Sequence, residues 1–175
     1  MDSSRKSRAL YEEDPKYDKA LENLKSHLLT EKLELCAPDH RHPLHLETDG
    51  SDDGWGAVLF QVIKGTRRVI RMWGKQWPGT FDTKPPYHKE AKAWMNAMDL
   101  IQPFAAGSPF PVQAFTDHSP LTWIKHTNGK GPVSQFLVDK LSTMDFVKNY
   151  IQGPDNIVAD ALSKFPMLGP RILRR

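Results

Sequence analysis

The sequence lacks the features on which several classes of protein depend. Its 175 residues include a single cysteine, Cys36, which excludes an internal disulfide and a cysteine-rich zinc site. No apolar run approaches the roughly 20 residues that a membrane-spanning helix requires. The first ten residues, MDSSRKSRAL, contain no apolar stretch of the signal-peptide type. We therefore expect an intracellular protein with no membrane partner.

The chain also has little excess charge outside its two ends. The formal net charge is +3, but six of the 24 basic residues and one of the 21 acidic residues lie within residues 1–10 and 167–175. The body between these ends carries 18 basic and 20 acidic residues. Charge alone therefore gives no indication of nucleic-acid binding.

Hydropathy periods predict one mixed α/β domain. Alternating patterns joined by short turns at 54–56 and 64–66 predict three antiparallel strands over residues 43–49, 55–63 and 67–77. A helical period predicts a helix over 88–102, which Pro103 and Gly107 should end. The remaining pattern predicts strands at 111–117 and 145–151 and helices at 119–126, 133–143 and 156–164. We expect a five-stranded mixed sheet, three antiparallel strands followed by two parallel ones, flanked by helices.

We divide the chain into four segments. Residues 1–10 are polar and without period, and we expect them to be disordered or added by cloning. A helix and linker occupy residues 11–43, with an amphipathic helix over about 12–30. The main domain covers residues 44–166, and a basic tail covers residues 167–175.

Four acidic residues occupy positions that a folded sheet could gather. Asp49 and Asp117 each end a predicted strand, and if these strands are parallel neighbours, their carboxylates lie side by side. Glu90 lies in the first turn of the 88–102 helix, and Asp160 lies beside apolar positions of the last helix. Clustered carboxylates repel one another unless cations share them. Oxygen-only ligands favour Mg²⁺ or Mn²⁺, and two such ions can promote attack of water on a phosphate.

Each of these acids also has an ordinary structural interpretation. An aspartate at a strand end often forms a turn, and an acid in the first turn of a helix is favoured by the helix dipole. Asp52 and Asp53 show how readily loops collect acids, and we interpret both as solvated. The residue pattern alone leaves the metal cluster and these structural roles open.

The segments that hold the four acids resemble the ribonuclease H motifs of gypsy-type LTR retrotransposons. The resemblance is carried, in this order, by TDGSDDGWGAVLF, YHKEAKAW, FTDHSPLTWI and GPDNIVADALSK, and it spans about Leu44 to Phe165. The segment from Tyr17 to Pro38 resembles the end of the connection region that precedes this domain in a reverse transcriptase.

This resemblance implies a ribonuclease H-like fold and an endonuclease that degrades the RNA strand of RNA/DNA hybrids during reverse transcription. It implies two Mg²⁺ ions, replaceable by Mn²⁺, with Asp49, Glu90, Asp117 and Asp160 as metal ligands and catalytic residues. The implied partners are the hybrid and the polymerase domain of the same Pol polyprotein. The implied location is the cytoplasm, within virus-like particles, or the nucleus if a host has adopted the domain.

Residues around the acids are candidates for substrate contacts, because the 2′-hydroxyl and groove shape distinguish RNA in a hybrid from DNA. A turn or surface role stays open for each of them. Three basic residues alternate along the third strand: Arg67, Arg71 and Lys75. They either hold phosphates or form a solvated face. The candidate substrate contacts are Gly50, Ser51, Asn96, Thr116, His118, Ser119 and Tyr150.

Two features of related enzymes are absent. Cellular and retroviral relatives place a histidine before the fourth acid, where this chain has KNYIQGPDN with Tyr150 nearest. The R-x-x-R-W pattern is also missing from GKGPVSQFLVDKL. These departures leave open a weakly catalytic or host-adopted module that tethers the polymerase or binds nucleic acid. A second alternative is a nuclease of the integrase or resolvase type on the same fold.

Overall fold

A computed structural model describes Glu22, Ser26 and residues 35–79, 84–117 and 145–164. The chain forms two compact units, residues 1–33 and 34–175, and the sheet belongs to the second. Glu22 and Ser26 are helical, as the helix predicted over residues 12–30 requires, and its other positions lie outside the described residues. The helices predicted over 119–126 and 133–143 also lie outside them.

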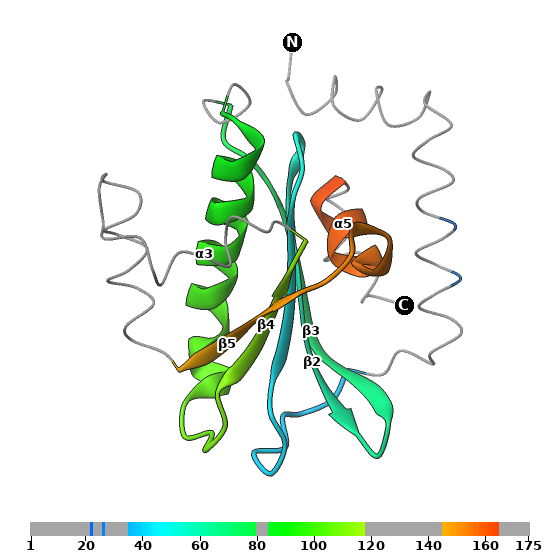
Figure 1. The fold of residues 1–175 in the computed structure, drawn as a ribbon, viewed down its shortest axis with the longest axis vertical. Helices are drawn as coiled ribbons and strands as arrows, with labels where there is room; N and C mark the ends of the chain where they lie inside the picture. Colours follow the sequence, from blue (N-terminus) through cyan, green and yellow to red (C-terminus); the bar gives the residue numbers. More distant parts are fainter. Residues whose placement is uncertain (1–21, 23–25, 27–34, 80–83, 118–144, 165–175) are drawn as a thin grey trace. The chain divides into compact units, whose positions relative to one another are not determined.

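The second unit is built on a five-stranded sheet with the strand order β3-β2-β1-β4-β5 (Figure 1). Strands β1, β2 and β3 pair antiparallel, and β4 runs parallel to both β1 and β5. The predicted mixed sheet, with three antiparallel strands followed by two parallel ones, is confirmed. The strands are β1 (His45–Gly50), β2 (Gly54–Ile63), β3 (Thr66–Gln76), β4 (Val112–Thr116) and β5 (Phe146–Tyr150).

Of the two predicted hairpin turns, one is confirmed and the other is displaced. Lys64 and Gly65 join β2 to β3 with φ angles of 52° and 77°, the positive values that a two-residue hairpin turn needs. The turn predicted at 54–56 is wrong, because these residues begin β2 and Gly56 pairs with Asp49. The chain turns at 51–53 instead, where Ser51 Oγ accepts a hydrogen bond from the N–H of Asp53.

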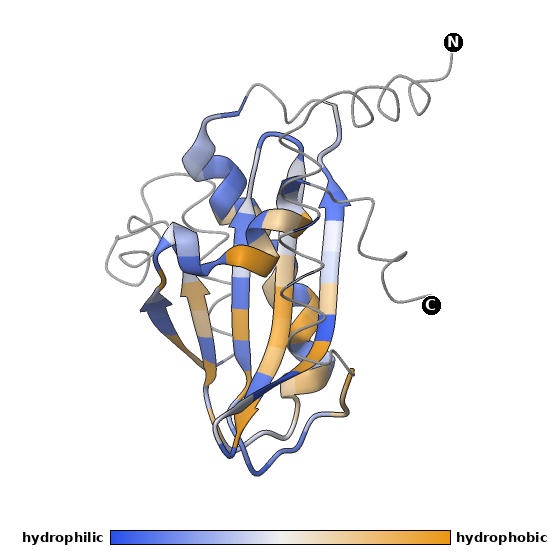
Figure 2. Ribbon diagram, turned by 90° about the vertical axis from the view of Figure 1, so that its right-hand side faces the viewer, coloured by the Kyte–Doolittle hydropathy of each residue, from blue (hydrophilic) through white to orange (hydrophobic). Residues whose placement is uncertain are grey.

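Two helices cover opposite faces of the sheet, α3 (Pro86–Ala105) and α5 (Ile157–Lys164) (Figure 1). The 3₁₀ turn η2 (Gly153–Asp155) leads into α5. Helix α3 packs Trp94 and Ile101 into a core that includes Leu46 and Leu59 of the sheet. Apolar residues gather in the central strands, and polar residues gather at the loops (Figure 2). None of the described helices is both long and apolar enough to cross a membrane.

Helix α3 continues past its predicted end at residue 102 and reaches Ala105, so Pro103 lies inside its last turn and does not end it. A proline there removes one backbone donor. The next residue, Phe104, packs against the core and meets Trp73 edge-on, with ring centres 6.1 Å apart, so packing favours the extra turn. The helix ends before Gly107, whose φ of 80° is typical of the glycine that follows a helix.

The three basic side chains predicted to share one face of β3 do so only in part. Arg71 and Lys75 pair with Leu59 and Trp55, four residues apart on β2, and therefore lie on the same face. The β2–β3 register shifts by one residue between Leu59 and Phe60, so Arg67 and Arg71 point to opposite faces. Arg67 Nη1 and Nη2 donate to the two carboxylate oxygens of Glu47 at 2.8 and 2.7 Å. The Arg67 guanidinium also lies 3.8 Å from the ring centre of Phe60. Arg67 therefore ties β3 to β1 through an ion pair, and phosphate binding by the basic residues of β3 stays a prediction.

Candidate metal centre

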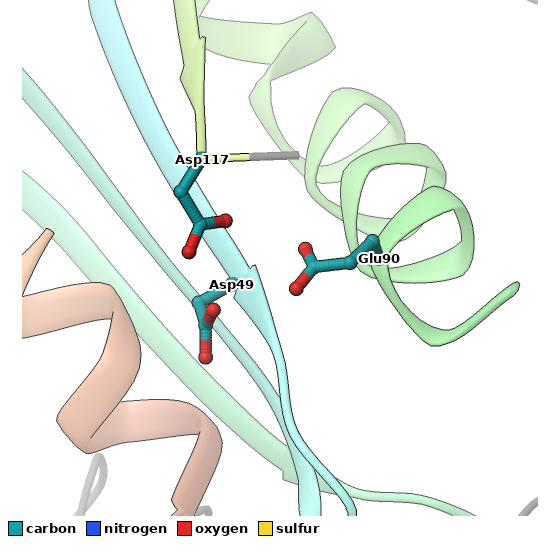
Figure 3. Close-up of side chains that lie close together, drawn as sticks. All are labelled: Asp49, Glu90 and Asp117. Carbon is teal, nitrogen blue, oxygen red and sulfur yellow. The ribbon is translucent and has the colours of Figure 1, made fainter. Parts of the chain in front are cut away.

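Three of the four predicted acids meet at one end of the sheet (Figure 3). Asp49 is the fifth residue of β1, and Asp117 follows the last residue of β4. The parallel register pairs Glu47 with Phe115. Asp49 and Asp117 each follow two residues later and therefore lie side by side. Glu90, from α3, points its carboxylate toward both aspartates (Figure 3). One carboxylate oxygen of each acid lies within 4.8 Å of the other two.

Gly50 allows α3 to come close enough to deliver Glu90. A Cβ at Gly50 would lie 2.7 Å from the carbonyl carbon and oxygen of Lys89 and 2.9 Å from the backbone nitrogen of Glu90. Real Cβ atoms do not approach backbone so closely, so a larger residue would displace the helix. The close approach that Gly50 permits is therefore made to α3, and its contact with the substrate stays a prediction.

Burial raises the pKa values of two of these acids. Asp49 is 6% exposed, and burial raises its pKa to about 6; a hydrogen bond from Ser163 opposes this rise, and the charges of neighbouring aspartates add to it. Burial also raises the pKa of Glu90 to about 9, and the charges of Asp49 and Asp117 add to that rise. Full ionisation of the cluster at neutral pH therefore requires a nearby positive charge.

The donor atoms of the cluster fit a hard divalent cation. All are carboxylate oxygens, which Mg²⁺ and Mn²⁺ prefer. In the described part of the chain, Glu90 Oε2 and Asp117 Oδ1 are buried and accept no hydrogen bond. Buried acceptors without partners are costly, and a shared cation would satisfy them and relieve the repulsion between the acids. The three carboxylates are therefore consistent with a metal site.

Asp160 is paired differently from the other three acids. It lies in the first turn of α5, its side chain is 40% exposed, and its carboxylate oxygens lie 2.6 and 2.8 Å from Nζ of Lys164. Its charge nevertheless contributes to the raised pKa values of Asp49 and Glu90. The role of Asp160 as a fourth metal ligand stays a prediction.

The candidate substrate contacts differ widely in exposure. Thr116 is buried at the end of β4, while Tyr150, its partner in the β4–β5 register, is 59% exposed. Asn96 is half-buried on α3, and Ser51 lies half-buried in the turn after β1. A contact with nucleic acid stays a prediction for each of these residues. Two further candidates lie outside the described residues, His118 and Ser119.

Sequence reasoning missed two buried polar side chains beside the acids. Ser163 is fully buried, and its hydroxyl donates a hydrogen bond to Oδ2 of Asp49. Lys89 is 2% exposed, and its Nζ donates to Oδ1 of the exposed Asp52 at 2.7 Å. A serine near the end of a helix and a lysine near the start of one both suggest surface positions. The only available signal was that Ser163 lies inside the fourth motif, GPDNIVADALSK.

Comparison with known proteins identifies the family. Residues 39–143 match the model of an RNase H-like domain found in reverse transcriptase. The chain is 34% identical over 148 residues to the retrovirus-related Pol polyprotein from transposon gypsy of Drosophila melanogaster, and 31% identical over 147 residues to that from transposon 412. Each match covers 83% of this chain, which spans only 14% and 12% of the length of these two relatives.

Solved structures share the fold at low sequence identity. The chain resembles LC11-RNase H1, isolated from compost, with a TM-score of 0.57 and 14% identity, over 75% of this chain and 99% of that one. It resembles the foamy viral protease-reverse transcriptase in complex with dsDNA with a TM-score of 0.53 and 15% identity, over 69% and 25%. The predicted ribonuclease H-like fold is confirmed, and the chain belongs to the family of RNase H-like domains of reverse transcriptases.

Proposed function

We propose that this domain is an endoribonuclease that hydrolyses the RNA strand of RNA/DNA hybrids during reverse transcription. The observation that carries the proposal is the convergence of Asp49, Glu90 and Asp117, whose ligand oxygens lie within 4.8 Å of one another. Two Mg²⁺ ions are the proposed cofactors, with Asp160 as the fourth ligand and Mn²⁺ as a substitute. Membership of the reverse-transcriptase family supports this assignment.

In the proposed reaction, the oxygen of a water molecule bonds to an RNA phosphorus and the bond to the 3′ oxygen breaks. The products carry a 3′-hydroxyl and a 5′-phosphate. Bound Mg²⁺ supplies electrostatic stabilisation of the attacking and leaving oxygens. The protein contributes carboxylates on a strand, at a strand end and on a helix, and such elements hold ligands in place better than loops do.

The relatives support the proposed partners. LC11-RNase H1 has been solved in complex with an RNA/DNA hybrid, and its structure resembles this chain with a TM-score of 0.56 at 13% identity. The gypsy and 412 relatives are Pol polyproteins, which supports a polymerase domain in the same polyprotein. On this basis we propose that the domain works in the cytoplasm, inside virus-like particles.

The test is a cleavage assay with the full chain and an RNA/DNA hybrid labelled separately on each strand, in Mg²⁺ or Mn²⁺. We expect cutting of the RNA strand alone, abolished by EDTA and by Asp117→Asn. The matched control is Asp145→Asn, which changes an exposed aspartate just before β5. Cutting that survives Asp117→Asn would contradict the proposal, and cutting of duplex DNA would favour an integrase-type nuclease.

One observation favours the alternative of a catalytically weak module. Asp160, a proposed ligand, is paired with Lys164 instead of lying with the other three acids. Calorimetric titration of the full chain with Mn²⁺ separates the two functions. An intact site binds Mn²⁺ and loses that binding in Asp117→Asn, whereas a degenerate site shows no binding that depends on Asp117.

A further inference from the structure

A single buried side chain links the end of α5 to the first acid of the cluster. Ser163 has no exposed surface, and its Oγ donates to Oδ2 of Asp49. The same Oγ lies 2.8 Å from the backbone oxygen of Asp160, one turn earlier in the helix. A hydroxyl has one hydrogen, and a carboxylate accepts it more strongly than a neutral carbonyl does. The contact with Asp49 is therefore the stronger of the two.

The backbone of Ser163 is held independently of its hydroxyl. Its carbonyl oxygen accepts a hydrogen bond of 2.9 Å from Oγ of Ser51, which lies two residues after Asp49. Ser51 Oγ also accepts hydrogen bonds from the N–H groups of Asp53 and Gly54, so the turn holds this oxygen in place. The last turn of α5 is therefore fixed to the segment that carries Asp49 at two points.

The close approach of α5 depends on a glycine opposite Asp49. Gly56 pairs with Asp49 in the β1–β2 ladder. A Cβ at Gly56 would lie 2.3 Å from the carbonyl oxygen of Ala159 and 2.7 Å from the nitrogen of Ser163. Backbone therefore packs on backbone here, and this brings the short serine side chain within reach of Asp49.

The geometry points to Ser163 as a positioning residue of the metal centre, whose hydroxyl fixes the carboxylate of Asp49 in the orientation that faces Glu90 and Asp117. This inference rests on the proposed function. By binding Oδ2, the hydroxyl limits rotation of the carboxylate and leaves Oδ1 to a cation. Groups that orient metal ligands in this way have a direct effect on metal affinity.

The test compares Mn²⁺ dissociation constants, measured by calorimetry on the full chain, for Ser163→Ala and Ser163→Thr. We expect Ser163→Ala to weaken Mn²⁺ binding about tenfold. We expect Ser163→Thr, which keeps the hydroxyl, to restore most of the affinity. The matched control is Val158→Ala, which removes buried apolar atoms from the same helix but no hydrogen bond to Asp49. It should lower the unfolding temperature and leave the dissociation constant unchanged.

The outcomes separate this inference from the proposed function. Ser163→Ala with unchanged Mn²⁺ affinity would overturn the inference, as would equal losses in Ser163→Ala and Ser163→Thr, because packing would then explain both. If the wild-type chain itself binds no Mn²⁺ and cuts no hybrid, the proposed function fails instead. If Ser163→Ala does not fold, Ser163→Cys replaces it, since a thiol keeps the volume but is a weak donor.

Discussion

Glu47 of β1 and Arg67 of β3 meet across the intervening strand β2 through two parallel hydrogen bonds of 2.8 and 2.7 Å. The side chain of Glu47 is 6% exposed and that of Arg67 is 22% exposed, so the pair is largely removed from water. A buried pair of this kind is costly to break, because the remaining charge keeps its desolvation penalty. Glu47 lies on the strand that carries Asp49, two residues before that acid.

Removing one member of this ion pair should destabilise the domain. We expect Arg67→Met to lower the free energy of unfolding by about 3 kcal/mol, because it leaves the Glu47 carboxylate buried without a partner. The double variant Glu47→Leu/Arg67→Met should recover most of that loss, since no charge remains. Urea unfolding measures both, and a double variant no more stable than Arg67→Met would refute the explanation.

A methyl group at Gly56 should separate α5 from the sheet. The added Cβ would overlap the backbone of α5, so we expect Gly56→Ala to lower the free energy of unfolding by about 1–3 kcal/mol. Gly79→Ala is the matched control, because a Cβ built there meets no atom of the described residues within 4 Å, its two chain neighbours aside. Chemical denaturation measures both variants, and equal stabilities would show that α5 does not pack as described.

The acid cluster should make the metal-free domain less stable as the pH rises. Burial raises the pKa of Glu90 to about 9 from its ordinary value of 4.5, so the folded state holds a proton that the unfolded state releases. The stability that this proton contributes is therefore fully present below the pKa of Glu90 in the unfolded state. It is lost as the pH rises toward the pKa of Glu90 in the folded state. In EDTA, we expect Glu90→Gln to melt above the wild type at pH 8 and close to it at pH 5. Thermal unfolding followed by circular dichroism at both pH values is the check, with Asp145→Asn as the exposed control. A gain that is the same at both pH values would argue against a titrating Glu90.

Divalent metal should reverse this destabilisation. A ligand that binds only the folded state at about 100 times its dissociation constant adds about 2.7 kcal/mol. We expect Mn²⁺ to raise the unfolding temperature of the wild type and to leave that of Asp117→Asn almost unchanged. Samples freed of divalent metal with EDTA provide the baseline, and differential scanning calorimetry measures the unfolding temperatures. An equal rise in both proteins would indicate metal binding elsewhere.

The positions of the strands along the chain and the positions of the acids could be predicted from the sequence because their signals are local. Alternating hydropathy and short turns fix neighbouring antiparallel strands, as the Lys64–Gly65 turn illustrates. Asp49 and Asp117 ended predicted strands, and the parallel pairing of β1 with β4 then brought them level. Four ordered motifs supplied the family resemblance, which the match over residues 39–143 confirms.

Only the tertiary structure decided how closely the elements approach one another. A one-residue register shift moved Arg67 to the face of Glu47, and no periodicity within β3 reveals such a shift. Asp49 and Ser163 are 114 residues apart in sequence, and their contact depends on a missing Cβ in a third segment. Hydropathy periods report which side of an element is buried, whereas these contacts depend on separations of a few ångströms between elements distant in sequence. The sequence by itself therefore determined the fold and the residue types of the site, and packing decided which side chains hold those residues in place.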